Sequence, residues 1–122
     1  MEENKSMSIE NLLESMAADL GRKPETMELL SQLNEKAVFE HAANKNFAMS
    51  GEQIPPKYKL LMSLAISAAL GSERCITQYT EVALRKGITK EEIVETLLLA
   101  RFIKGTTVMS ASTAAMRLLV EK

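Results

Sequence analysis

Hydrophobic positions near the N-terminus recur at the spacing of an α-helix. The apolar members of this first stretch are Leu12, Leu13, Met16 and Leu20. They fall on one side of a helical segment, as in a short amphipathic helix that docks on a core. Ser8 is a suitable N-cap and Gly21 a suitable residue to end the segment. The pattern predicts a helix over residues 9–20.

A second apolar stripe follows Pro24, a residue that suits the first position of a helix. The residues at helical spacing in this stripe are Met27, Leu30, Leu33, Ala37 and, as a further member, His41. Continuous spacing of this kind is typical of one face of a single element. The stripe therefore predicts one long helix that extends toward Ala48.

Proline and glycine divide the rest of the chain. Pro55-Pro56 precedes a predicted third helix over residues 57–70, which Gly71 ends. A fourth helix, capped by Ser72 or a neighbour, is predicted to run through Lys86 before Gly87.

The C-terminal third contains two further predicted helices. Thr89 and Glu92 have the spacing of a capping box, which opens a fifth helix over residues 90–104. Gly105 is expected to separate this helix from a last one over about residues 106–120. No segment shows a convincing strand pattern, so the chain is predicted to be all-α, a bundle of about six helices.

The segment Leu97–Ile103 is apolar nearly all round, whereas a surface helix of a small monomer should have one polar face. Small residues that permit close helix approach follow it, namely Ala111, Ser112, Ala114 and Ala115. A thick monomeric core is the plainer explanation. Because so short a chain has little room to bury both segments, we predict a homo-oligomer.

Length and charge narrow the function classes. With 122 residues the chain fits a single domain over residues 1–122, and its net charge of −1 has no basic stripe for nucleic acid. The polar segment Met1–Ser8 lacks the apolar region of a signal peptide, and Leu60–Leu70 is too short to span a bilayer. We therefore expect a cytoplasmic protein without a nucleic-acid or membrane partner.

The only cysteine, Cys75, occupies the start of the predicted fourth helix. The helix dipole and neighbouring Arg74 favour the thiolate form, whereas Glu73 opposes it. Tyr79 lies four residues on, and Ser72 three residues before, so both share a helix face with the cysteine. These three residues are the candidate catalytic set, although a buried inert thiol, a core tyrosine and a serine that serves only as a cap are the alternatives.

Three more residues are candidates for substrate binding: Lys59, Arg74 and His41. Lys59 forms a polar stripe with Ser63 and Ser67, which either faces a pocket or, in the interpretation we favour, is the solvated face of an amphipathic helix. His41 is the only histidine, and a lone histidine is more often a surface or core residue than a catalytic one. No His/Cys spacing fits a metal site and no nucleotide motif occurs, so no metal or cofactor is predicted.

Three features follow one another from about Pro55 to Ala100: the apolar helix Lys57–Leu70, the motif Ser72-x-x-Cys75-x-x-x-Tyr79, and the turn Gly87-Ile88-Thr89-Lys90-Glu91-Glu92-Ile93. This layout resembles the carboxymuconolactone decarboxylase family, which includes the alkylhydroperoxidase D-like proteins. The resemblance implies a helical alkylhydroperoxidase D-like fold and a hexamer, commonly a trimer of dimers.

The reactive positions of that family are largely replaced in this chain. Aligned on the Gly87 turn, Cys75 corresponds to the second cysteine of the family's pair, Ser72 to the first, and Tyr79 to the histidine. Leu60 occupies the acidic position, although Lys59 keeps the preceding base. A peroxidase cycle that closes an internal disulfide needs two thiols, so that cycle is excluded within one chain.

Three functions stay open. The leading one is a one-cysteine thiol peroxidase, with peroxiredoxin-type antioxidant activity, in which Cys75 is resolved by an external thiol. The second is a cofactor-free, decarboxylase-like lyase acting on a small carboxylated lactone, with His41, Tyr79, Lys59 and Arg74 as candidate acid–base and cationic groups. The third is a non-catalytic oligomeric scaffold or ligand-binding protein.

Overall fold

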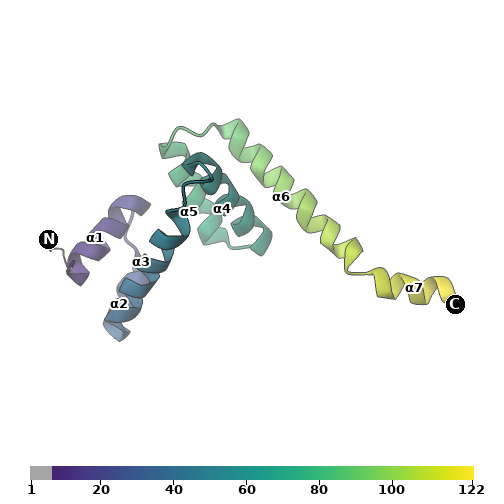
Figure 1. Cartoon of the computed structure of the whole chain (residues 1–122), viewed down its shortest axis with the longest axis horizontal. Helices are drawn as coiled ribbons and strands as arrows, with labels where there is room; N and C mark the ends of the chain where they lie inside the picture. Colours follow the sequence, from purple (N-terminus) through teal and green to yellow (C-terminus); the bar gives the residue numbers. More distant parts are fainter. Residues whose placement is uncertain (1–6) are drawn as a thin grey trace. The chain divides into compact units, whose positions relative to one another are not determined.

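The computed structural model describes residues 7–122, so most of the predicted polar segment Met1–Ser8 lies outside the described residues. Within residues 7–122 the chain forms seven helices and no strand, which confirms the all-α prediction (Figure 1). The helices are α1 (Ile9–Leu20), α2 (Glu25–Leu33), α3 (Glu35–Met49), α4 (Pro56–Leu70), α5 (Glu73–Arg85), α6 (Lys90–Ser110) and α7 (Thr113–Glu121). The chain divides into two compact units, one up to Pro56 and one from Lys57 to Lys122.

The first unit contains α1, α2 and α3. Ser8 caps α1 by accepting a hydrogen bond from the Asn11 amide, and Gly21 follows its last residue, as predicted. The single long helix expected after Pro24 is wrong, because Asn34 interrupts it. Asn34 has an extended backbone (φ −159°, ψ 93°), and its side chain accepts a hydrogen bond from the Ala37 amide at 3.1 Å.

The interruption at Asn34 also changes which side chains are buried in the first unit. An asparagine side chain competes with the helical backbone for hydrogen bonds, so it favours a cap over a helix interior. Leu33 directly before it is 84% exposed and does not belong to a buried stripe, whereas Val38 in α3 is fully buried. His41 is exposed on the same helix.

Two glycine turns connect the helices of the second unit. Gly71 and Gly87 have φ values of 74° and 85°, in the left-handed region that a residue with a Cβ rarely adopts. After each glycine, the next amide reaches back five residues, from Ser72 to the Ser67 carbonyl and from Ile88 to the Ala83 carbonyl. Both α4 and α5 therefore end in the arrangement of a Schellman motif.

Helix α6 is longer than expected. It continues through Gly105 to Ser110, and the last helix, α7, begins only at Thr113, so the predicted break at Gly105 is wrong. Gly105 lacks the positive φ that ends α4 and α5, which explains why the helix passes through it. Although α6 has 21 residues, none of the helices between residues 7 and 122 is long and apolar enough to cross a membrane.

The core of the second unit is formed where α4, α5 and the start of α6 meet. Its buried members are Leu64, Ala83, Ile88 and Ile93. Partly buried side chains pack around them, namely Leu60, Leu61, Ile76, Tyr79 and Leu97. This cluster holds the cysteine helix α5 against its two neighbours and so positions the candidate site.

Candidate functional site

Cys75 lies in the first turn of α5, directly after the turn that ends α4. Ser72 is the N-cap of α5, and its hydroxyl oxygen accepts a hydrogen bond from the Cys75 amide at 3.4 Å. The predicted cap role of Ser72 is thereby confirmed. The thiol of Cys75 is free and partly exposed. A free thiol at the positive end of a helix is placed for nucleophilic chemistry with a reagent that reaches it from solvent.

Tyr79 lies one helical turn after Cys75 and belongs to both the core and the site. It is partly buried and packs against the core cluster of the second unit. Burial raises the pKa of the Tyr79 hydroxyl above its ordinary value of 10.0, and the negative charge of Cys75 acts in the same direction. The hydroxyl therefore stays protonated at neutral pH and is available as a hydrogen-bond donor.

The polar stripe of α4 is not the solvated face that we favoured. Ser67 is only 7% exposed, and its hydroxyl donates to the Ser63 carbonyl at 2.8 Å, while the Ser63 hydroxyl donates to the Lys59 carbonyl at 2.8 Å. These internal bonds satisfy both hydroxyls on a helix face turned away from water. The exposed large hydrophobic side chains of α4 are Tyr58, Met62, Ile66 and Leu70.

The three candidate substrate-binding residues belong to three different helices. Arg74 is exposed in the first turn of α5, and Lys59 is partly exposed in the first turns of α4. His41 belongs to α3 of the first unit. Among residues 7–122 no group of three His, Cys, Asp or Glu side chains is placed to hold a metal ion.

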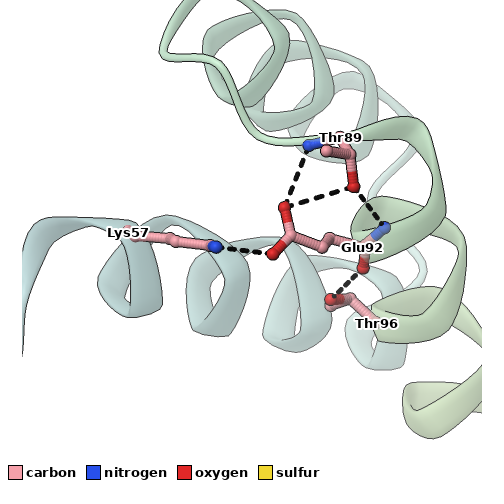
Figure 2. A network of polar contacts seen from close by, with 4 residues as sticks. All are labelled: Lys57, Thr89, Glu92 and Thr96. Carbon is pink, nitrogen blue, oxygen red and sulfur yellow. Dashed lines mark hydrogen bonds and ion pairs between the residues drawn. The ribbon is translucent and has the colours of Figure 1, made fainter.

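A polar network joins the start of α4 to the start of α6 (Figure 2). Glu92 Oε1 accepts hydrogen bonds from the Thr89 amide at 3.0 Å and the Thr89 hydroxyl at 3.2 Å, while the Thr89 hydroxyl oxygen accepts from the Glu92 amide at 3.0 Å. This is the predicted capping box. The other carboxylate oxygen, Glu92 Oε2, pairs with Lys57 Nζ at 2.5 Å.

The network changes the titration of both charged groups. The hydrogen bond from Lys57, followed by that from the Thr89 amide, lowers the pKa of Glu92 below its ordinary value of 4.5. In return, the hydrogen bond to Glu92 and its negative charge raise the pKa of Lys57 above 10.5. Both groups are therefore charged across the neutral range and hold the two helix starts together.

A family model described as the carboxymuconolactone decarboxylase family matches residues 24–118, which is most of the chain. The chain belongs to the carboxymuconolactone decarboxylase family. This confirms the resemblance seen in the second half of the sequence and extends it over both compact units. A search of curated proteins finds no match to this chain.

Two contacts of this family member were not predicted from its sequence. Lys57 pairs with Glu92, and the Lys104 ammonium donates a hydrogen bond to the Ala69 carbonyl at 2.5 Å. Each contact joins residues 35 positions apart, so no local pattern indicates it. Lysine near a helix C-terminus stabilises the unpaired carbonyls there, and Lys104 does this for α4 although it belongs to α6.

Proposed function

We propose that this member of the family is a thiol-dependent peroxidase that uses Cys75 as its only cysteine nucleophile and an external thiol as reductant. The observation that carries the proposal is the pairing of a free, partly exposed thiol in the first turn of α5 with the protonated hydroxyl of Tyr79 one turn away. Such a pair offers a nucleophile and a hydrogen-bond donor to the same small molecule.

The first chemical step consumes the peroxide. The Cys75 thiolate attacks the outer oxygen of an organic hydroperoxide, so that an S–O bond forms and the O–O bond breaks. Sulfur is oxidised by two electrons to the sulfenic acid, and the peroxide is reduced to an alkoxide, which takes a proton from water. The Tyr79 hydroxyl donates a hydrogen bond to the departing alkoxide oxygen and stabilises its charge.

The second stage regenerates the thiol with two equivalents of an external reductant. One thiol attacks the Cys75 sulfenic acid, which releases water and leaves a mixed disulfide. A second thiol attacks that disulfide, which releases the oxidised reductant and restores Cys75. This cycle needs one cysteine in the chain, in agreement with the single free cysteine of the sequence.

Charged and polar residues around the turn have supporting roles in this proposal. Ser72 holds the Cys75 amide and so orients the first turn of α5. Arg74 adds a positive charge next to the thiolate in sequence, and Lys59 adds one in the first turns of α4. Cationic side chains in this unit attract anionic hydroperoxides or thiols.

Sulfenic-acid trapping tests the proposal. The protein is treated briefly with an organic hydroperoxide across a range of pH, and the adduct is measured by intact mass. We expect rapid labelling that disappears in Cys75→Ser. Tyr79→Phe should slow labelling roughly tenfold, the effect of losing about 1.4 kcal/mol of transition-state stabilisation.

The second tyrosine of the chain provides a matched control. Tyr58 is 54% exposed on α4, so Tyr58→Phe makes the same chemical change away from Cys75 and should label at the wild-type rate. Labelling no faster than that of a small free thiol would overturn the proposal. Turnover of a carboxylated lactone by the same preparation would then support the decarboxylase-like lyase, and its absence a non-catalytic binding role.

A further inference from the structure

Two lysines join α4 to α6, one at each end of α4. At the start of α4, Lys57 pairs with Glu92 of α6. In the last turn of α4, the Ala69 carbonyl accepts a hydrogen bond from the Lys104 ammonium of α6. The two contacts are 12 residues apart on each helix, or about 18 Å at a rise of about 1.5 Å per residue. The two helices therefore run parallel, and each end of α4 is fixed to α6 by one lysine.

The Lys104 contact lies at the end of α4 that leads into the cysteine helix. The last carbonyls of an α-helix have no partner within the helix. In α4 the Ser67 carbonyl accepts a hydrogen bond from the Ser72 amide at 3.1 Å, and the Ala69 carbonyl accepts its bond from α6. At the start of α5 the Ser72 hydroxyl oxygen accepts a hydrogen bond from the Cys75 amide at 3.4 Å. A short series of hydrogen bonds therefore connects α6 to the backbone of Cys75 through the end of α4.

The start of α5 depends on these bonds more than the rest of the helix does. Ile76 is the first residue of α5 that packs against the core cluster, and Tyr79 and the fully buried Ala83 follow it. From Gly71 to Cys75 no residue is buried. The hydrophobic core therefore fixes the turn that carries Tyr79, whereas the position of Cys75 depends on the cap and on the end of α4.

We propose that Lys104 is a positioning residue for the Cys75 thiol, an inference that rests on the proposed peroxidase function. Its hydrogen bond fixes the end of α4, so that the capped first turn of α5 keeps Cys75 in place relative to Tyr79. The ammonium acts through the Ala69 carbonyl and not by contact with the reactants. An ammonium suits this task, because a charged donor forms a stronger hydrogen bond than a neutral donor does.

Two reactions of Cys75 in the full chain test this role. We expect Lys104→Gln to slow sulfenic-acid formation by an organic hydroperoxide roughly three- to tenfold, because the bond from the charged donor is lost. Lys104→Arg keeps a charged donor and should retain most of the wild-type rate. Alkylation by iodoacetamide uses the same sulfur but no hydrogen-bond donor, so its rate should be the same in all three proteins. Equal slowing of both reactions in Lys104→Gln, or an Arg variant as slow as the Gln variant, would overturn the proposal.

Lys57 provides a matched control on the same pair of helices. Lys57→Gln removes the lysine contact at the opposite end of α4 and should form the sulfenic acid at the wild-type rate. Amide hydrogen exchange gives a readout without peroxide: the Cys75 amide should exchange faster in Lys104→Gln than in Lys57→Gln, while amides of the core around Leu64 stay protected in both. Protected core amides also show that each variant is folded.

The outcomes separate this inference from the proposed function. If the wild type reacts rapidly with the hydroperoxide and Lys104→Gln reacts as fast, or Lys57→Gln is slowed as much, the positioning role is wrong and the peroxidase proposal stands. If the wild type reacts no faster than a small free thiol, the peroxidase proposal fails, and this inference fails with it.

Discussion

The two ends of the second unit differ in what supports them. From α4 to the third turn of α6, helices bury a shared cluster that includes Leu64 and Ile93. From Arg101 to Lys122 no residue is buried, and only Ser112 is partly covered, although this region is rich in apolar side chains. The first region is stabilised by contacts within the second unit, whereas the apolar side chains of the second region have no cover within that unit. Apolar content alone therefore does not show where a core lies.

The largest expected difference between the two regions is in the free energy of unfolding that is lost when a leucine is replaced by alanine. Leu64 is fully buried, so Leu64→Ala should lower the free energy of unfolding by about 2–5 kcal/mol through lost burial and the cavity left behind. Leu119 is 74% exposed, so Leu119→Ala should change it by less than about 0.5 kcal/mol. Chemical denaturation at several protein concentrations measures the free energy of unfolding of both variants. Equal losses of unfolding free energy at Leu64 and Leu119 would contradict the view that only the first region is stabilised by burial within the chain.

Glycine-to-alanine changes should have opposite signs in the two regions. At Gly87 the left-handed backbone penalises a Cβ, so Gly87→Ala should cost about 1–2 kcal/mol of folding free energy. At Gly105 the backbone is helical and the space is open, so Gly105→Ala should stabilise the chain by about 1 kcal/mol. Chemical denaturation under the same conditions measures both free-energy changes. A loss at Gly105 would indicate a close contact within the monomer.

Loss of a helix cap should have a smaller effect. Thr89→Ala removes the hydroxyl oxygen that accepts a hydrogen bond from the Glu92 amide, and it should cost about 1 kcal/mol of folding free energy. The Thr106 hydroxyl, in the exposed half of α6, donates to the Ile103 carbonyl three residues before it. Thr106→Ala is therefore the matched control and should change the free energy of unfolding by less than about 0.5 kcal/mol. Thermal denaturation, monitored by circular dichroism, measures the stability change of each variant. Similar changes for Thr89→Ala and Thr106→Ala would contradict the role of the cap.

The smallest effect should be the pH dependence of the Lys57–Glu92 pair. Because the pKa of Glu92 is lowered on folding, the contribution of Glu92 to the free energy of unfolding is complete above about pH 4.5. It is lost as the pH falls through the lower pKa of the folded state. The raised pKa of Lys57 has the opposite effect at alkaline pH. The contribution of Lys57 to the free energy of unfolding is complete below about pH 10.5 and is lost as the pH rises through the folded value.

A double-mutant cycle isolates this contribution. Unfolding of the wild type, Lys57→Gln, Glu92→Gln and the double variant is measured from pH 2 to pH 7, a range about the ordinary Glu value of 4.5. We expect the coupling between the two positions to be present at neutral pH and to vanish in acid. A coupling that persists at pH 2 would show that the two side chains interact without the carboxylate charge.

The candidate site was partly predictable from sequence. The cap role of Ser72 and the position of Cys75 at the start of α5 both follow from residues within four positions of each other. The catalytic role of Cys75 and Tyr79 stays a prediction. The face of α4 that would be buried was predicted wrongly at Ser67, because serine is polar and its internal bond to the Ser63 carbonyl is invisible in a hydropathy pattern.

The sequence by itself determined the helical class, the ends of α1, α4 and α5, and the capping box of α6, because each depends on hydrogen bonds between near neighbours. Only the tertiary structure decided which face of α4 is covered, that Lys57 meets Glu92, and that the apolar side chains of α6 after Ala100 have no cover within the second unit. Such features depend on contacts between residues about 35 positions apart, whose approach is set by the packing of whole helices.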